Sequence, residues 1–190
     1  MLDRRGFGQS PAAEGEDFLR DGDDIAEVTG DGAHLVGHSY GGLGAMFAAA
    51  RRPDATRSLT LLEPAAFALG QDDPAGRSLV EGVRRVWHQG VTDEEWVIAF
   101  LKAVRSDPDE FPPEFLAAAL PLVPVLRRAR PTWYPDLPLA ERIGASRTVV
   151  EGAGHEIQFT GTPINEALLA LWRTDPSSLA APPASGPDSS

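Results

Sequence analysis

One short segment constrains the fold of this chain more than any other. Residues 37–42 read Gly-His-Ser-Tyr-Gly-Gly, a G-x-S-x-G motif that follows an apolar run at 34–36 and precedes an alanine-rich stretch at 42–52. That order predicts a strand, a sharp turn and a helix that Pro53 ends. Very small neighbours would let strand and helix approach closely enough to hold the Ser39 hydroxyl over the end of a sheet. The alternative is a glycine-rich turn in which the serine is incidental.

Predicted helices and strands also flank this motif. A strand at 58–62 is nearly continuous in apolar residues, as is typical of a parallel sheet covered on both faces. A helix is expected within 15–29, although Gly22 weakens the prediction. Its apolar residues are spaced so that they can share one face: Phe18, Leu19, Ile25 and Val28.

From 71 to 120 the pattern is helical, with no strand between the helices. Thr92 and Glu95 have the spacing of a capping box, which opens a helix. Apolar residues then follow along one face of that helix: Trp96, Phe100 and Val104, with Val97 and Leu101 beside them. Aromatic side chains on such a face serve either as packing or as the underside of a lid over a pocket, and both interpretations stay open.

The last third of the chain returns to strands. We expect strands at 122–126, where Pro124 is unusual for a strand, and at 147–150. A helix is predicted from 162 to 172, with a threonine N-cap and a proline at its start. The residues at 175–190 are rich in Ser, Ala, Pro and Gly, which predicts a disordered tail.

The motif at the turn implies further catalytic residues. A serine hydroxyl is a weak nucleophile near neutral pH, so it needs a histidine to accept its proton and an acid to orient that histidine. Of the four histidines, His155 follows a predicted strand in a small-residue loop, where open α/β sheets place their sites. We therefore expect His155 to be the general base rather than a structural imidazole. The Tyr40 N–H, at the start of the helix, is the expected oxyanion donor.

Charge and composition exclude several classes of function. With 28 acidic and 17 basic residues the net charge is −11, which opposes binding to nucleic acid. The one dense basic cluster is expected to be a solvated edge beside a strand; it consists of Arg127, Arg128 and Arg130. The absence of cysteine excludes disulfides, thiolate zinc sites and a cysteine nucleophile.

Neither a membrane partner nor a cofactor is expected. No run of eighteen apolar residues occurs, and the first residues lack the apolar region of a secretory signal, so we predict a cytoplasmic protein. Carboxylates and histidines are too scattered for a recognisable metal-ligand spacing, so we expect no metal and no organic cofactor.

The motifs together resemble those of the α/β-hydrolase superfamily. Besides 37–42, the resemblance rests on Gly-Ala-Gly-His at 152–155 and on Asp-Arg-Arg-Gly-Phe-Gly-Gln-Ser at 3–10, which is similar to the loop after that family's fourth strand. It covers residues 1 to about 174. It implies an α/β fold with a mostly parallel sheet, flanking helices and a helical lid insertion. The implied parts are a core at 1–69 and 122–174, a lid at 70–121 and a tail at 175–190.

The resemblance also implies a Ser-His-acid triad, in which Ser39 attacks and His155 carries the proton. The family's common position for the acid would fall near 127–132, where arginines and prolines occur instead. Glu63, at the end of the sixth strand of the implied fold, and Asp136, further along the later loop, are the two candidates. We favour Glu63, whose alternative role is to cap a backbone N–H at the strand end.

The first strands of the implied fold have no counterpart, because the loop at 3–10 starts at the third residue. Either the true chain begins upstream of Met1, or the fold is N-terminally truncated and lacks the family's second oxyanion N–H; for the sequence as it stands we expect the truncated fold. The strand that carries Ser39 would then be an unpaired edge, which predicts a homo-oligomer formed through it.

Two hypotheses of function follow. The first is a serine hydrolase that acts on a carboxylic ester, lactone or similar small acyl substrate through an acyl-enzyme. A serine at the elbow disfavours dehalogenases and epoxide hydrolases, which resemble this family but carry a carboxylate there. The second is a truncated, catalytically impaired hydrolase fold that acts as a binding or dimerisation module.

Overall fold

The computed structural model describes residues 2–133 and 162–173. The predicted strand at 147–150, the tail at 175–190, His155 and Asp136 lie outside these residues. The elements in chain order are α1 (Phe18–Val28), β1 (Ala33–His38), α2 (Ser39–Arg51), β2 (Thr56–Leu62), η1 (Phe67–Gly70), α3 (Pro74–Trp87), α4 (Asp93–Ala103), η2 (Pro108–Glu110), α5 (Pro113–Ala119), η3 (Leu120–Leu122), α6 (Val123–Leu126) and α7 (Thr162–Arg173).

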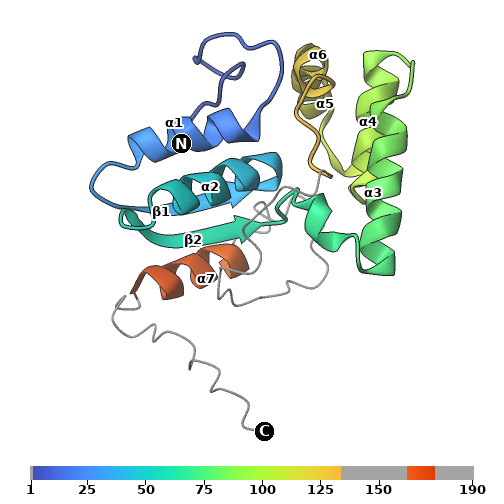
Figure 1. The fold of residues 1–190 in the computed structure, drawn as a ribbon. Coiled ribbons are helices and arrows are strands. Elements are labelled where there is room, and N and C mark those ends of the chain that lie inside the picture. Colours follow the sequence, from blue (N-terminus) through green and yellow to red (C-terminus); the bar gives the residue numbers. More distant parts are fainter. Residues whose placement is uncertain (1, 134–161, 174–190) are drawn as a thin grey trace, which may run out of the picture.

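The centre of the fold is a parallel pair of strands, β1 and β2, joined by α2. Their register places Val36 beside Thr60 and His38 beside Leu62, so both strands end at the same edge. Helices α1 and α2 cover one face of the pair, and α7 lies on the opposite side (Figure 1). This arrangement confirms the predicted strand, turn, helix and strand around residues 37–42 and shows an α/β fold.

A hydrophobic core lies between the strands and the two helices α1 and α2. Leu43 and Met46 of α2 are buried with Phe18 of α1, and Leu59 and Leu61 of β2 pack against them. Burying each of these large side chains contributes about 1.5–3 kcal/mol relative to leaving it exposed. The elbow is therefore built on a buried apolar core.

Gly22 has a packing role inside α1. A Cβ at this position would lie 2.7 Å from the Cβ of Phe47, so α1 and α2 can approach closely only because the side chain is missing. Gly44 plays the same part from α2, where an added Cβ would lie 3.0 Å from the Cβ of Asp21. The predicted face of α1 is correct for Phe18 but wrong for Val28, which is 64% exposed at the end of the helix.

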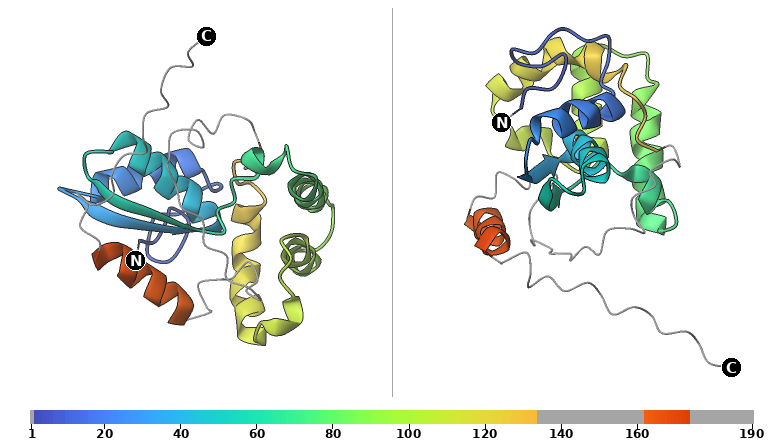
Figure 2. Two further views of the ribbon diagram at one scale, coloured as in Figure 1. Left: turned by 90° about the horizontal axis from the view of Figure 1, so that it is seen from below. Right: turned by 60° about the vertical axis from the view of Figure 1, so that its left-hand side comes forward.

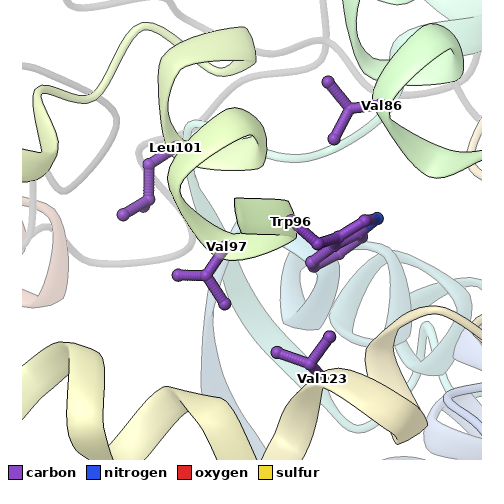
Figure 3. Packing of buried hydrophobic residues seen from close by; sticks show 5 residues of the cluster. All are labelled: Val86, Trp96, Val97, Leu101 and Val123. Atoms are coloured by element: carbon purple, nitrogen blue, oxygen red, sulfur yellow. The ribbon is translucent and has the colours of Figure 1, made fainter. Parts of the chain in front are cut away.

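Helices α3 to α6 form a separate group beyond the carboxyl ends of the strands (Figure 2). Its core holds Trp96 of α4, which is fully buried between Val86 of α3 and Val123 of α6 (Figure 3). The predicted capping box is present, because Thr92 and Glu95 exchange the expected hydrogen bonds at the start of α4.

The aromatic face of α4 serves as packing. Trp96 stacks on Phe100 with ring centroids 5.2 Å apart, and Trp87 meets Trp96 edge-on at 5.5 Å. Such pairs contribute about 0.5–1.5 kcal/mol beyond the area that they bury. The sequence left two roles open for this face, packing or the underside of a lid. These contacts favour packing inside the helical group for Trp96.

The strand predicted at 122–126 is wrong, because the segment is helical. It forms the end of η3 and all of α6. Pro124 lies in the first turn of α6, where a helix needs no N–H from it, whereas a strand would lose a ladder hydrogen bond. Val123 is fully buried against α4, so tertiary packing also favours the helix. The helical segment thus continues to Leu126.

Two of the three arginines after α6, Arg128 and Arg130, are exposed as predicted, but the cluster follows a helix instead of a strand and its guanidinium groups are bonded. Arg127 donates to the carbonyl oxygens of Gln89 and Val91. Arg128 donates to the Glu14 carbonyl at 2.5 Å, and Arg130 forms a two-bond pair with Asp17 at 2.7 and 2.9 Å. Arg127 therefore binds within the helical group, whereas Arg128 and Arg130 tie that group to the segment that precedes α1. Within the described ranges, no helix is both long and apolar enough to span a membrane.

Candidate active site

Ser39 occupies a left-handed turn between β1 and α2. Its φ is 50°, while His38 before it is still extended, with φ −108° and ψ 140°. A residue with a side chain adopts this region at a cost of about 1–3 kcal/mol, and the surrounding packing has to hold it there. The turn therefore has the strained geometry expected of a nucleophile elbow.

The small residues around Ser39 are required by the space available. A Cβ on Gly37 would lie 2.6 Å from the Cα of Gly42 and 2.9 Å from the Cβ of Ala45, because strand and helix nearly touch there. A Cβ on Gly42 would lie 3.1 Å from the Cβ of Pro64. These two glycines let β1, α2 and the loop after β2 meet at one point.

Glu63 lies beside the elbow. It directly follows Leu62, the register partner of His38, just as Ser39 directly follows His38. Its φ is 41°, so both residues that leave the paired strands are left-handed. The loop is held in place because the Ala65 N–H donates to the Ser39 carbonyl oxygen at 3.0 Å. The exposed Glu63 carboxyl group is thus carried by the backbone next to Ser39.

Tyr40 lies in the first turn of α2, and its side chain points to the start of α1 and to the segment after α6. Its hydroxyl donates to the Glu16 carbonyl oxygen at 3.0 Å and accepts from the Phe18 N–H at 3.3 Å. The Arg130 carbonyl oxygen lies at 3.3 Å. Burial raises the pKa of the Tyr40 hydroxyl, which therefore stays a donor. Its backbone N–H belongs to the first turn of the helix, where N–H groups have no intrahelical acceptor.

A buried ionic group lies under the ring of Tyr40. The Arg4 guanidinium is 5.4 Å from the ring centroid and contacts two buried carboxylates, Glu16 at 2.6 Å and Asp21 at 3.1 Å. One cation thus faces two anions. Burial raises the pKa of Glu16 and of Asp21, and this exceeds the opposite effect of Arg4 on both. No sequence pattern pointed to this group, because its members come from a loop and from the start of a helix.

The raised pKa of Glu16 predicts how the stability of the fold depends on pH. A carboxyl group whose pKa is raised on folding binds more protons in the folded state, so its contribution is present in acid and is lost as pH rises through the folded pKa. In Glu16→Gln that loss disappears, and the variant should gain stability relative to the parent between pH 4 and pH 8. Urea unfolding at both pH values measures it, with Glu27→Gln on the exposed face of α1 as control. An equal effect of Glu16→Gln at both pH values would contradict the prediction.

The other predicted members of the site are only partly placed. His155 and Asp136 lie outside the described residues, so their relation to Ser39 stays a prediction. His34 lies nearer the start of β1 and not at the elbow. Its Nδ1 and the Ser58 hydroxyl are 2.8 Å apart, and the ring centroid of Trp172 of α7 lies 5.6 Å from that of His34. Among the described side chains, no group of three or more His, Cys, Asp or Glu residues is arranged to hold a metal ion.

A hollow of about 650 Å³ lies between the segments 12–17 and 128–131. Its lining is strongly charged and includes Arg20, Glu16 and Arg128. Acyl pockets are mostly apolar with few polar groups, so this hollow does not have the character expected of one.

Comparison with known protein families gives one match. Residues 1–93 match the family described as alpha/beta hydrolase fold. That span runs from the loop at 3–10 through the elbow and Glu63 to the start of α4. No match was found among curated proteins or among solved structures.

Proposed function

We propose that the chain is a serine hydrolase of small acyl compounds, such as carboxylic esters or lactones, because residues 1–93 match the family described as alpha/beta hydrolase fold. The observation that carries the proposal is the left-handed Ser39 between β1 and α2, preceded in the strand by Gly37, which no larger residue could replace without displacing backbone. A structural turn would need neither the strain nor a hydroxyl at its apex.

In the proposed reaction the Ser39 hydroxyl attacks the acyl carbon while His155 takes its proton. The Tyr40 N–H donates to the oxygen that becomes negative. The acid, Glu63 or Asp136, holds the imidazole and stabilises its cation. His155 then returns the proton to the leaving oxygen, and water repeats the sequence to release the acid product and free Ser39.

The helical group supports an enclosed acyl site. Helices α3 to α6 lie beyond the carboxyl ends of β1 and β2, on the side where Ser39 and Glu63 leave the strands (Figure 2). We propose that these helices act as a lid, which excludes water and strengthens the electrostatic interactions inside the site. No metal or organic cofactor is part of this scheme.

Hydrolysis of short-chain p-nitrophenyl esters tests the proposal. We expect turnover by the parent chain and a loss of about 10⁴-fold or more in kcat/KM for Ser39→Ala and for His155→Ala. Ser58→Ala, which removes the other serine near a histidine, is the matched control and should retain activity. Equal turnover by the parent and Ser39→Ala would contradict the proposal.

A second candidate is a module that associates through β1. Within the described residues β1 has one neighbour, β2. The strand Ala33–His38 carries no Lys, Arg, Asp or Glu, and Val36 is 43% exposed on it. Edge strands without charge are templates for pairing with another chain. We therefore propose that a second copy of the chain pairs along β1.

Light scattering at micromolar concentration tests this association. We expect a dimer for the parent chain and a monomer for Val36→Lys, because a charge on the edge opposes pairing. Val28→Lys places the same charge on an exposed residue of α1 and should leave the dimer intact. A monomeric parent chain would rule out this pairing.

A further inference from the structure

The Tyr40 side chain joins the elbow to two segments that are distant in sequence. Through its hydroxyl it bonds to the backbone on both sides of Asp17, at Glu16 and Phe18, and it lies within hydrogen-bond distance of the Arg130 carbonyl oxygen. The Arg130 N–H also donates to the Glu16 carbonyl oxygen, at 2.7 Å. One hydroxyl therefore occupies the junction where the start of α1 and the end of the helical group meet.

The ring of Tyr40 is in contact with two further side chains. Phe18 packs edge-on against it at 5.7 Å between centroids, and the Arg4 guanidinium lies 5.4 Å from its centroid. Arg4 is itself held by the buried carboxylates of Glu16 and Asp21. The side chain is thus contacted at both its ring and its hydroxyl, and these contacts restrain the backbone to which it is attached.

That backbone is the part of the elbow that does chemistry in the proposed function. The peptide between Ser39 and Tyr40 carries the N–H that would bind the oxyanion, and it adjoins the strained φ of Ser39. Strained residues keep their conformation only where the surroundings over-determine it. A displacement of about 1 Å in a reacting group can cost about 10²-fold in rate.

We propose that the Tyr40 hydroxyl is a positioning group that holds the elbow in its reactive geometry. The inference rests on the proposed function for its effect on rate, but not for its effect on the backbone. Tyr40→Phe removes the hydroxyl and leaves the ring, the N–H and the packing against Phe18. Any effect on Ser39 must therefore pass through the lost hydrogen bonds.

A remote threonine supplies the matched control. The Thr56 hydroxyl at the start of β2 donates to the Arg52 carbonyl oxygen at 2.8 Å, so Thr56→Val likewise removes hydroxyl-to-backbone bonding, at the strand end opposite Ser39. We expect each variant to lower Tm by about 2–4 °C. A difference between them at the elbow would then reflect position and not stability.

Saturation kinetics with a fluorophosphonate probe separate binding from reaction at the serine. For Tyr40→Phe we expect the limiting labelling rate to fall about 10- to 100-fold, with the half-saturating probe concentration unchanged within about twofold. Thr56→Val should label like the parent. Asp17→Asn keeps a good N-cap for α1 but loses the charge pair with Arg130, and should give a smaller fall. A Tyr40→Phe rate equal to that of the parent or of Thr56→Val would overturn the inference.

Hydrogen exchange at residues 37–42 gives a readout that needs no activity. Tyr40→Phe should speed exchange of these amides by about tenfold or more, whereas Thr56→Val should not change it. If the parent chain fails to react with the probe, the proposed function fails, and exchange alone decides the positioning role. Unchanged exchange in Tyr40→Phe would then refute that role.

Discussion

Replacing Gly37 with alanine is expected to dismantle the elbow, whereas the same replacement at Gly41 should leave it intact. At Gly37 the new methyl group would lie 2.6 Å from the Gly42 Cα and 3.0 Å from the Gly41 carbonyl oxygen. Both neighbours are backbone, so β1 and α2 have to move apart. We expect a loss of about 3 kcal/mol in the free energy of unfolding and of about 10²-fold or more in kcat/KM.

Gly41 provides the matched control two residues beyond Ser39. A Cβ there has the Arg4 Nε, at 4.0 Å, as its nearest contact among the described residues, which is an ordinary van der Waals distance. Because alanine is the better helix former, Gly41→Ala should gain about 0.4–1 kcal/mol. Urea denaturation and ester hydrolysis measure both variants. Equal stability of Gly37→Ala and Gly41→Ala would contradict the claim that β1 and α2 approach too closely to admit a side chain at residue 37.

The second large effect is expected at the acid. Glu63 follows β2 as Ser39 follows β1, and the backbone of its loop is bonded to the elbow through Ala65. If Glu63 orients the imidazole, Glu63→Gln should lower kcat by about 10³- to 10⁴-fold while KM changes little. Asp136→Asn should then retain nearly full activity.

The reverse result would assign the acid to Asp136. Because Glu63 is exposed, Glu63→Gln should lower the free energy of unfolding by no more than about 0.5 kcal/mol. Circular dichroism during thermal unfolding therefore separates a catalytic loss from an unfolding one. Full activity in both variants would mean that neither residue is the acid.

Much of the α/β layer could be predicted from the sequence because its signals are local. The apolar runs of β1 and β2, the glycines around Ser39 and the stop at Pro53 all act within a few residues of where they stand. The parallel pairing then places Ser39 and Glu63 at one edge without further information. The capping box of α4 is equally local.

The predictions that were wrong or incomplete concern segments whose structure depends on tertiary contacts, which a local sequence pattern does not contain. The segment 122–126 has the composition of a strand, but the buried Val123 and the helix-compatible Pro124 make it helical. Nor did the sequence indicate that Arg127 and Arg130 bind carbonyl and carboxylate oxygens supplied by distant segments.

The side-chain contacts that hold the elbow could not be predicted from the sequence either. The ionic group of Arg4, Glu16 and Asp21 and the hydroxyl of Tyr40 meet only after α1 packs on α2. Gly22, which weakened the predicted helix, turned out to permit that packing. His155 and Asp136 lie outside the described residues, so the completed triad stays a prediction.

The central claim is that Ser39 is an activated nucleophile, and intact-mass analysis after exposure to a fluorophosphonate tests it most directly. Such a probe reacts with an activated serine and requires no knowledge of the substrate. We predict one adduct per chain, located at Ser39 by peptide mapping, present in Ser58→Ala and absent from Ser39→Ala. An unlabelled folded chain, or an adduct that survives Ser39→Ala and disappears in Ser58→Ala, would contradict the claim.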